Sequence, residues 1–240
     1  MKINEDILIP PVAIACHDAG AANIIVNMID EYQDEIRICV DGPAKKIFND
    51  YFPSLQCVTL ENALENAHTL LSGTGWGSFE YFSRIMAKKK NIKNIAVIDH
   101  WVNYKQRFIH NSIEVLPDQI IVTDNFAKNK AEKLFPSISI IQAPNLYLQK
   151  ESFLATSFRQ RQCKTPIENL LIVAEPLTIR TIEGEDTLEL PSIDYLMSNL
   201  MKINLSKDLI NICLRPHPSE YPENYNFIRE KYKDLATDFM

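Results

Sequence analysis

Five short polar segments of this sequence carry candidate residues for acid-base chemistry or for binding a ligand. Each follows a run of apolar residues: HDAGAAN (17–23), SGTGWGS (72–78), DHWVNY (99–104), AEPLTIR (174–180) and RPHPSE (215–220). In open α/β sheets, ligands bind in the crevice beyond the carboxyl ends of the strands. If the apolar runs are strands, these five segments are the candidate functional loops.

His17 and Asp18 begin the first of these segments. Histidine has an intrinsic pKa of about 6.5, which makes His17 a candidate general base. Asp18 is a second candidate base, although an aspartate before a helix is also a common amino-terminal cap. Gly20 would let an anion or a sugar hydroxyl approach the backbone amides of that helix closely. Both roles of Asp18 remain open at this level.

The second segment contains three of the six glycines of the chain. Glycine permits turns that side chains forbid, and Ser78 is placed to cap the helix that follows. The spacing is not GxGxxG and lacks the lysine of a phosphate-binding loop, so neither a dinucleotide site nor an NTPase site is predicted. Trp76 is suited to stacking on a sugar, although a tight strand-to-helix turn would use the same glycines. The candidate sugar-binding loop comprises Gly73, Thr74, Gly75, Trp76 and Gly77.

Asp99 and His100 follow the apolar run 95–98. A carboxylate beside an imidazole offers both halves of acid-base catalysis. Adjacent residues of an extended chain point in opposite directions, so the two side chains need not touch and one of them could be structural. Asp99 is the leading candidate base, and a hydrogen-bonded aspartate at the end of a strand is the alternative.

Arg215 and His217 lie at the end of the last apolar run, and Pro216 and Pro218 flank the histidine. Proline fixes its own φ angle and favours extended backbone in the residue before it, so the imidazole is presented rigidly. If the strand conformation continues, Arg215 and His217 point to the same side. A guanidinium and an imidazole held in this way form a candidate clamp for a phosphate or diphosphate.

Short β-branched runs alternate with longer amphipathic segments along most of the chain. Predicted strands cover residues 12–16, 36–40, 56–60, 69–71, 94–98, 119–122 and 137–141. Predicted helices cover residues 21–32, 43–51, 61–66, 78–90 and 125–135. Nearly continuous apolar strands separated by helices predict a parallel sheet covered on both faces, which is the doubly wound α/β arrangement.

The pattern divides the chain into three parts: a Rossmann-like domain (1–145), a linker with helical content (146–168) and a partial Rossmann-like domain (169–240). The last part supplies predicted strands at 169–174 and 210–214 and predicted helices at 190–201 and 223–235. Two βα units are few for an independent doubly wound domain. The expected fold is therefore α/β with two doubly wound Rossmann-like domains, the second of them incomplete.

The bulk composition argues against several classes of protein. A net charge of −6 and a pI near 5.4 speak against a nucleic-acid-binding surface. No run approaches the roughly 18 apolar residues that a membrane-spanning helix requires, and the first apolar run lacks a preceding basic segment, so a cytoplasmic protein without a transmembrane segment is expected. The five cysteines show no CxxC spacing, and no metal site is predicted.

The segment RPHPSE after an apolar strand resembles the His-Pro motif of bacterial glycosyltransferases of the GT-B class. These include sialyltransferases, capsule polysaccharide transferases and the polyol-phosphate transferases of wall teichoic acid. In those families the histidine contacts the phosphate of the nucleotide donor, and the resemblance implies this role for His217. Glu175 and the proline after it are similar to the first strand-end loop of a GT-B carboxy-terminal domain. We place Arg215 and Ser219 in the same predicted nucleotide-binding set.

The first half of the chain, with its HDAG and GTGWG loops, is similar in layout to a GT-B acceptor domain. The sialyltransferases take their base from a short acidic motif that ends in glycine, and HDAG lacks its spacing, so the base is not assigned by the resemblance. A GT-B carboxy-terminal domain also continues past the His-Pro strand with further βα units, whereas this chain ends at Met240. A fragment of a longer enzyme, or a shortened relative that has lost donor binding, is therefore expected.

Together these features predict an inverting, metal-independent glycosyltransferase that takes a nucleotide-activated sugar as its substrate, needs no cofactor and acts in bacterial surface glycan synthesis. Asp99 or Asp18 would be the base, with His17 and His100 as further acid-base candidates. The Arg-His pair after the last strand would stabilise the departing phosphate, and the GTGWG loop would belong to the acceptor side.

Two alternatives remain open. One is a nucleotide-sugar 2-epimerase or hydrolase of the same fold, and the other is a non-catalytic remnant that binds a sugar or a partner protein. The expected partners are a nucleotide sugar and a glycan acceptor. Peripheral association with a membrane, and an oligomer or partner subunit that completes the second domain, are both compatible with the sequence.

Overall fold

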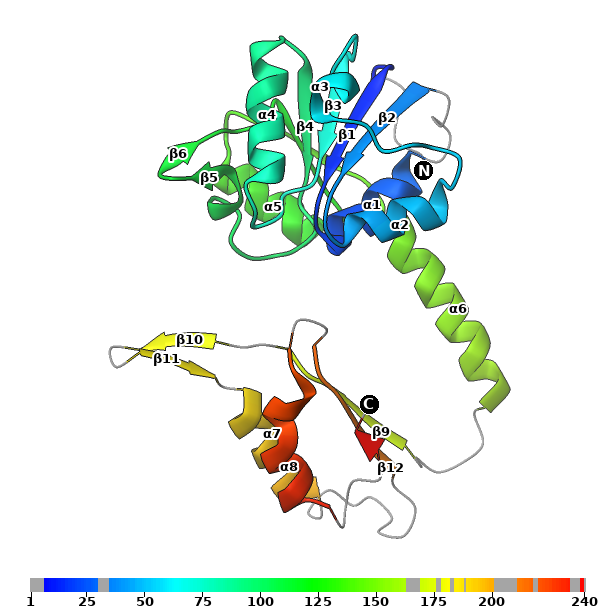
Figure 1. Ribbon diagram of the computed structural model, residues 1–240, viewed down its shortest axis with the longest axis vertical. Coiled ribbons are helices and arrows are strands. Elements are labelled where there is room, and N and C mark those ends of the chain that lie inside the picture. Colours follow the sequence, from blue (N-terminus) through cyan, green and yellow to red (C-terminus); the bar gives the residue numbers. More distant parts are fainter. Residues whose placement is uncertain are drawn as a thin grey trace. The chain divides into compact units, whose positions relative to one another are not determined.

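The computed structural model of the protein describes residues 7–29, 35–162, 169–175, 178–181, 184–187, 189–200, 211–217, 220–233 and 238–239. The chain divides into two compact units, residues 1–157 and 158–240, and each is described by itself (Figure 1). The division falls inside helix α6 (Leu146–Gln162), which occupies most of the segment expected to be a linker with helical content.

A six-stranded parallel sheet forms the centre of the first unit, with the strand order β2-β1-β3-β4-β7-β8. The strands are β1 (Val12–Cys16), β2 (Ile36–Val40), β3 (Thr69–Ser72), β4 (Lys93–Val97), β7 (Gln119–Val122) and β8 (Ser139–Gln142). In the register of the sheet, Ile14 of β1 lies opposite Ile38 on one side and Leu71 on the other. The α/β class and the Rossmann-like parallel sheet predicted for this part of the chain are confirmed.

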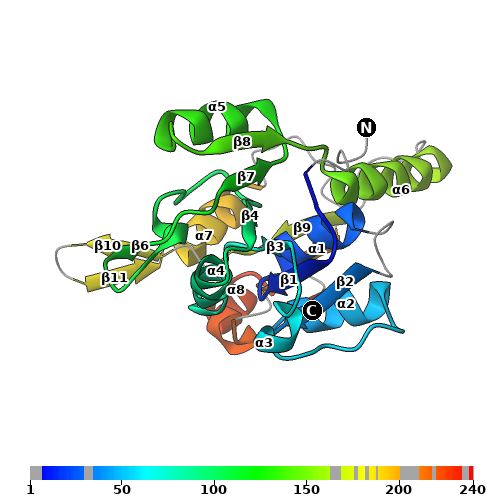
Figure 2. The same ribbon diagram turned by 90° about the horizontal axis from the view of Figure 1, so that it is seen from above.

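Helices cover both faces of this sheet. They are α1 (Ala19–Met28), α2 (Ala44–Tyr51), α3 (Leu60–Ala63), α4 (Phe79–Lys89) and α5 (Asn125–Leu134). Ile14 packs in a core with α1 and α2, whereas its neighbours Ala13 and Ala15 pack in another core with α3 and α4 (Figure 2). A third core joins Ile120 of β7 to α5. Burial on both faces explains why these strands are apolar at nearly every position.

The strand predicted at residues 56–60 is wrong. Only an isolated bridge between Ile38 and Cys57 forms there. The hydroxyl of Thr59 then caps α3, because its Oγ1 accepts a hydrogen bond from the backbone N–H of Asn62 at 3.3 Å. The cap starts a helix directly after the bridge, so the extended segment cannot continue along β2.

Several short elements of the first unit were not predicted. A 3-10 turn, η2 (Gln106–Phe108), leads into a small antiparallel hairpin of β5 (Ile109–His110) and β6 (Ile113–Glu114). Strands of two residues are too short to show a periodic pattern, which is why sequence periodicity did not reveal them.

The second unit contains a three-stranded parallel sheet with the order β13-β12-β9. Its elements are β9 (Asn169–Val173), the hairpin β10 (Thr178–Thr181) and β11 (Gly184–Thr187), α7 (Glu189–Asn199), β12 (Asn211–Arg215), η4 (Pro222–Tyr225), α8 (Asn226–Lys231) and β13 (Asp238–Phe239). Its core packs Ile172 and Leu214 of the sheet against Met197 of α7 and Ile228 of α8. No helix in the described part of the chain is long and apolar enough to cross a membrane.

Candidate functional site

The sheet of the first unit has a topological switch point between β1 and β3. β1 lies between β2 and β3 in the sheet. The connection from β1 therefore leads to β2 on one side of β1, and β3 is then added on the other side. The helices that follow these two strands, α1 and α4, pack in cores on opposite faces of the sheet. Doubly wound folds bind their ligands at this point, beyond the carboxyl ends of the strands. The HDAG and GTGWG loops therefore flank the expected ligand position.

His17 and Asp18, at the end of β1, contact each other. His17 Nδ1 lies 2.7 Å from Asp18 Oδ1, and the two side chains are 37% and 36% exposed. β1 ends at Cys16, so the alternation of side chains along a strand no longer separates the two residues. Asp18 occupies the position before α1, but its side chain makes no capping hydrogen bond. Of the two roles left open for Asp18, the capping role is therefore absent.

Glu80 of α4 binds the backbone of His17. Its Oε1 accepts a hydrogen bond from the backbone N–H of His17 at 2.8 Å. Glu80 is fully buried, and Oε2 has no hydrogen-bond partner within the described residues. Burial raises the pKa of Glu80, and the hydrogen bond from His17 opposes that shift. Glu80 thus joins the end of β1 to the helix that follows β3.

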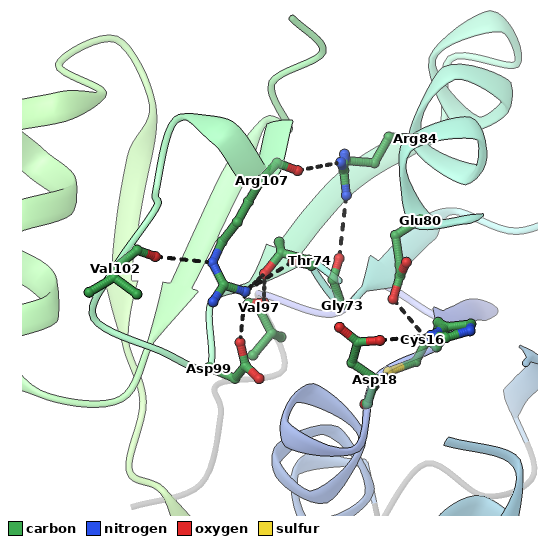
Figure 3. Close-up of polar contacts among 11 residues, drawn as sticks. Cys16, Asp18, Gly73, Thr74, Glu80, Arg84, Val97, Asp99, Val102 and Arg107 are labelled. Atoms are coloured by element: carbon green, nitrogen blue, oxygen red, sulfur yellow. Dashed lines mark hydrogen bonds and ion pairs between the residues drawn. The ribbon is translucent and has the colours of Figure 1, made fainter. Parts of the chain in front are cut away.

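Asp99, at the end of β4, is held by Arg107 rather than by its neighbour His100. Arg107 Nη1 donates to Asp99 Oδ1 at 3.0 Å, and these side chains are 7% and 18% exposed. The same nitrogen donates to the carbonyl oxygen of Thr74 at 3.0 Å, so one guanidinium joins the loops after β3 and β4 (Figure 3). His100 is exposed, and its ring lies beside Trp101. The two adjacent side chains therefore diverge.

The glycines of the GTGWG loop provide space rather than unusual backbone angles. None of Gly73, Gly75 and Gly77 has a positive φ angle, so the turn does not need glycine for its backbone conformation. A Cβ atom added to Gly75 would lie 2.6 Å from Asp18 Oδ2, and one added to Gly73 would lie 3.0 to 3.2 Å from three neighbouring side chains. A Cβ at Gly77 would meet nothing closer than 4.0 Å. A side chain at Gly73 or Gly75 would therefore press on its neighbours, whereas Gly77 has room for one.

A fourth glycine accommodates the second aspartate. The carboxylate of Asp99 lies against the α-carbon of Gly20 in the first turn of α1, where a Cβ atom would overlap Oδ2. The two candidate carboxylates therefore lie against glycine backbone: Asp18 on the β3 loop and Asp99 on α1.

Other residues of the GTGWG loop have different roles. Thr74 is buried, and its hydroxyl donates to the Val97 carbonyl oxygen at 3.0 Å, so this side chain anchors the loop instead of facing a ligand. Trp76 is 64% exposed, as a stacking platform must be. Ser78 makes no capping hydrogen bond, because its backbone is already helical at φ −84° and ψ −10°. The predicted cap at Ser78 is therefore wrong.

A cavity of about 300 Å³ lies beside Trp76. It is lined by Gly75, Trp76, Gly77, Gln106, Arg107 and Ile109. The guanidinium carbon of Arg107 lies 5.8 Å from the centroid of the Trp76 ring, within the range of a cation-π contact. The predicted sugar-binding loop thus borders a concave surface, which is where small ligands bind.

Three charged residues of this site, Glu80, Arg84 and Arg107, were not predicted as site residues. Arg84 is buried and donates to the carbonyl oxygens of Gly73 at 3.3 Å and Arg107 at 3.2 Å. Burial lowers the pKa of Arg84 to about 10. A signal was present in the sequence, because Glu80 and Arg84 are four residues apart and lie with Ala87 on the buried side of α4. Two charges on the inner face of a helix indicate buried partners.

The pKa of the Cys16 thiol is affected by the carboxylates of this site. This thiol is fully buried, and burial together with the carboxylates of Glu80, Asp18 and Asp99 raises its pKa well above the ordinary value. The thiolate is the reactive form of cysteine, so Cys16 is a packing residue here and not a nucleophile. Within the described ranges no three histidine, cysteine or carboxylate side chains are grouped as metal ligands.

In the second unit, the predicted phosphate-binding residues follow two neighbouring strands. β9 and β12 pair in parallel, and the N–H of Ala174 donates to the carbonyl oxygen of Arg215 at 2.9 Å. Glu175 and His217 therefore follow these strands at the same edge of the sheet. The side chains of Glu175 and Arg215 are exposed and that of His217 is half-buried, whereas Ser219 lies outside the described residues.

The contact between His17 and Asp18 has a measurable consequence. The hydrogen bond to Asp18 raises the pKa of His17 above 6.5, although partial burial opposes the shift. We expect an NMR titration of the imidazole to give a pKa above 6.5 in the wild type and a value at or below 6.5 in Asp18→Asn. Asp41→Asn is the matched control, since Asp41 is a more distant carboxylate with a smaller effect on His17. An unchanged pKa in Asp18→Asn would contradict the pairing.

Glu80 should make the stability of the protein depend on pH. Because its pKa is raised in the folded state, Glu80 stabilises the fold most at low pH, and this contribution is lost as the pH rises through the folded pKa. The free energy of unfolding of the wild type should therefore fall relative to that of Glu80→Gln as the pH rises above about 4.5. Urea denaturation at several pH values measures the difference between the two free energies. A difference that does not change with pH would mean that burial does not raise the pKa of Glu80.

Comparison of the chain with protein-family models and with curated protein sequences gives no match in either case.

Proposed function

We propose that the protein is a glycosyltransferase of the GT-B type, which transfers a sugar with inversion and without a metal ion from a nucleotide-activated donor. The observation that carries the proposal is the meeting of the His17–Asp18 pair with the glycine-rich Trp76 loop at the β1/β3 switch point. Such a pair can accept a proton, and an exposed indole can stack on a sugar ring. We also propose that the protein acts in bacterial surface glycan synthesis, because RPHPSE resembles the motif of the His-Pro glycosyltransferases.

His17 is the general base in this proposal, and Asp18 orients it. With Nδ1 bonded to Asp18, the neutral imidazole accepts the proton of the acceptor hydroxyl at Nε2. The acceptor oxygen then bonds to the anomeric carbon of the donor, and the bond from that carbon to the phosphate oxygen breaks. The raised pKa of His17 suits a base that operates near neutral pH.

The contacts of Asp99 favour the His17–Asp18 pair as the base. Asp99 Oδ1 accepts a hydrogen bond from Arg107, and Oδ2 lies against the α-carbon of Gly20. Oδ1 is therefore committed to Arg107, and the side chain of Asp99 is 18% exposed against 37% for His17. We assign Asp99 to positioning, because its ion pair with Arg107 holds the loop after β4 onto the loop after β3.

The second unit binds the nucleotide in this proposal. Arg215 and His217 would neutralise the charge that develops on the departing diphosphate, which is the main task of such groups in phosphate-leaving reactions. Support comes from the parallel pairing of β9 and β12, because it brings the segments that contain Glu175 and His217 to one edge of the sheet.

Isothermal titration of the full chain with CMP, UDP, GDP and CDP tests the donor site. One nucleotide should bind, and His217→Ala and Arg215→Ala should each weaken it about tenfold to hundredfold, the usual effect of removing a hydrogen bond to a charged group. Arg229→Ala is the matched control, since Arg229 is an exposed arginine of α8 in the same unit. Absence of binding by the folded wild type to all four nucleotides would overturn the proposal. Turnover of the donor without an acceptor would indicate an epimerase or hydrolase instead.

A second candidate function is a non-catalytic module that binds a sugar or a partner protein. It is favoured by Leu171 and Val173 of β9, which are 55% and 67% exposed at the edge of the small sheet. Exposed apolar side chains on an edge strand are a common mark of a contact surface. Sugar binding without any nucleotide binding would support this candidate.

A further inference from the structure

Arg107 lines the cavity beside Trp76, and its hydrogen bonds to the described residues use only two of its three guanidinium nitrogens. Its Nε donates to the Val102 carbonyl oxygen at 3.3 Å, and its Nη1 donates to Thr74 and Asp99 (Figure 3). Nη2 makes no hydrogen bond within the described residues, yet it is not among their buried unpaired atoms. Because Arg107 lines the cavity, Nη2 is a donor that a ligand can reach. The side chain of Arg107 is only 7% exposed and its guanidinium is fixed by three neighbours, so it is a preorganised donor.

The ligand that fits this cavity carries little or no charge. Asp99 lies 3.0 Å from Arg107 and balances its charge, and Arg107 is the only charged residue among the described residues that line the cavity. Asp18 is a second carboxylate near the cavity, because its Oδ2 lies against Gly75, which is also a lining residue. A free carboxylate or phosphate would be repelled by these carboxylates. A hydroxyl oxygen can accept a hydrogen bond from Nη2 without this repulsion.

The shape and the other lining groups fit one sugar ring. The cavity volume of about 300 Å³ is at the lower end of the range of small-ligand sites. The exposed indole of Trp76 offers a flat apolar face to the C–H groups of a pyranose. The amide of Gln106 is exposed and both donates and accepts hydrogen bonds, as a set of sugar hydroxyls requires.

We propose that this cavity is a subsite for an uncharged pyranose, which stacks on Trp76 and accepts a hydrogen bond from Arg107 Nη2. Its role as the acceptor subsite depends on the proposed glycosyltransferase function, whereas the binding of a neutral sugar does not. Because Arg107 also holds Asp99 and the β3 loop, an occupied subsite would be directly connected to the residues that surround His17 and Asp18.

Saturation-transfer NMR with methyl glycosides tests the subsite on the full chain. The probes are neutral methyl glycosides of the gluco, galacto, manno and N-acetylglucosamine series, with methyl glucuronide and methyl galacturonide as charged partners that differ only at C6. At least one neutral glycoside should give a saturable signal, and in the gluco and galacto series the uronide should bind at least tenfold more weakly than its neutral partner. Trp76→Ala should weaken the neutral ligand about tenfold or more. Phe126→Ala is the matched control, because Phe126 is also 64% exposed but does not line the cavity.

A fluorescence titration provides an independent measurement. The chain has two tryptophans, so Trp101→Phe leaves Trp76 as the reporter, and the neutral glycoside should change its emission with the same affinity. Tighter binding of the uronide, absence of a signal from every neutral glycoside, or equal effects of Trp76→Ala and Phe126→Ala would overturn the inference. Nucleotide titration tests the glycosyltransferase proposal separately: glycoside binding without nucleotide binding would remove the transferase and keep the subsite, and the reverse result would remove the subsite alone.

Discussion

Replacing Arg107 by methionine should lower the free energy of unfolding of the protein by about 3–5 kcal/mol, the usual cost of leaving one partner of a buried ion pair alone. Arg107 and Asp99 are 7% and 18% exposed, so water cannot replace the lost guanidinium freely. The change also removes the donors to the carbonyl oxygens of Thr74 and Val102. Urea denaturation followed by far-UV circular dichroism measures the effect.

Two further variants separate the ion pair from a general loss of packing. Lys105→Met changes an exposed cation two residues away and should alter the free energy of unfolding by less than about 0.5 kcal/mol. The double variant Arg107→Met with Asp99→Asn should recover part of the lost stability, because it removes the uncompensated carboxylate. A single Arg107→Met variant as stable as Lys105→Met would show that the guanidinium does not hold these loops together.

Replacing His17 by alanine should lower kcat for sugar transfer about 10²- to 10⁴-fold, which is the usual contribution of a general base. The affinity for the nucleotide should not change, because the proposed nucleotide site belongs to the second unit. Release of the nucleotide in the presence of an acceptor measures kcat, and isothermal titration measures the affinity. His68→Gln is the control, since His68 is exposed and precedes β3, at the amino-terminal end of the strand and away from the site.

The pH profile distinguishes His17 from Asp99 as the base. The rate should rise with pH through the raised pKa of His17, because only the neutral imidazole accepts a proton. In Asp18→Asn this limb should move to lower pH, since the largest cause of the raised pKa is removed. If His17→Ala stayed within threefold of the wild type while Asp99→Asn lost activity, the base would be Asp99.

The aspartates show how far sequence reasoning reached in this site. Strand-end position selected both Asp18 and Asp99, and the structure places both at the carboxyl edge of the sheet. The partner of Asp99 and the group that holds the backbone of His17 could not be predicted, because Arg107 lies 8 residues from Asp99 and Glu80 lies 63 residues from His17. No local pattern encodes a contact over such a distance along the chain. For the same reason the sequence did not reveal that the carboxylate of Asp18 lies beside Gly75.

The pattern of apolar runs was sufficient to predict the α/β class, the six strands of the central sheet and the polar loops after them. Burial on both faces makes a parallel strand apolar along its whole length, and that signal is local. The neighbouring positions of β1 and β3 at the switch point come from the tertiary structure. The contact between His17 and Asp18 is also visible only in the tertiary structure, as is the ion pair of Asp99 with Arg107 rather than with His100. Strand order and side-chain pairing depend on contacts between distant segments, which periodicity and propensity do not contain.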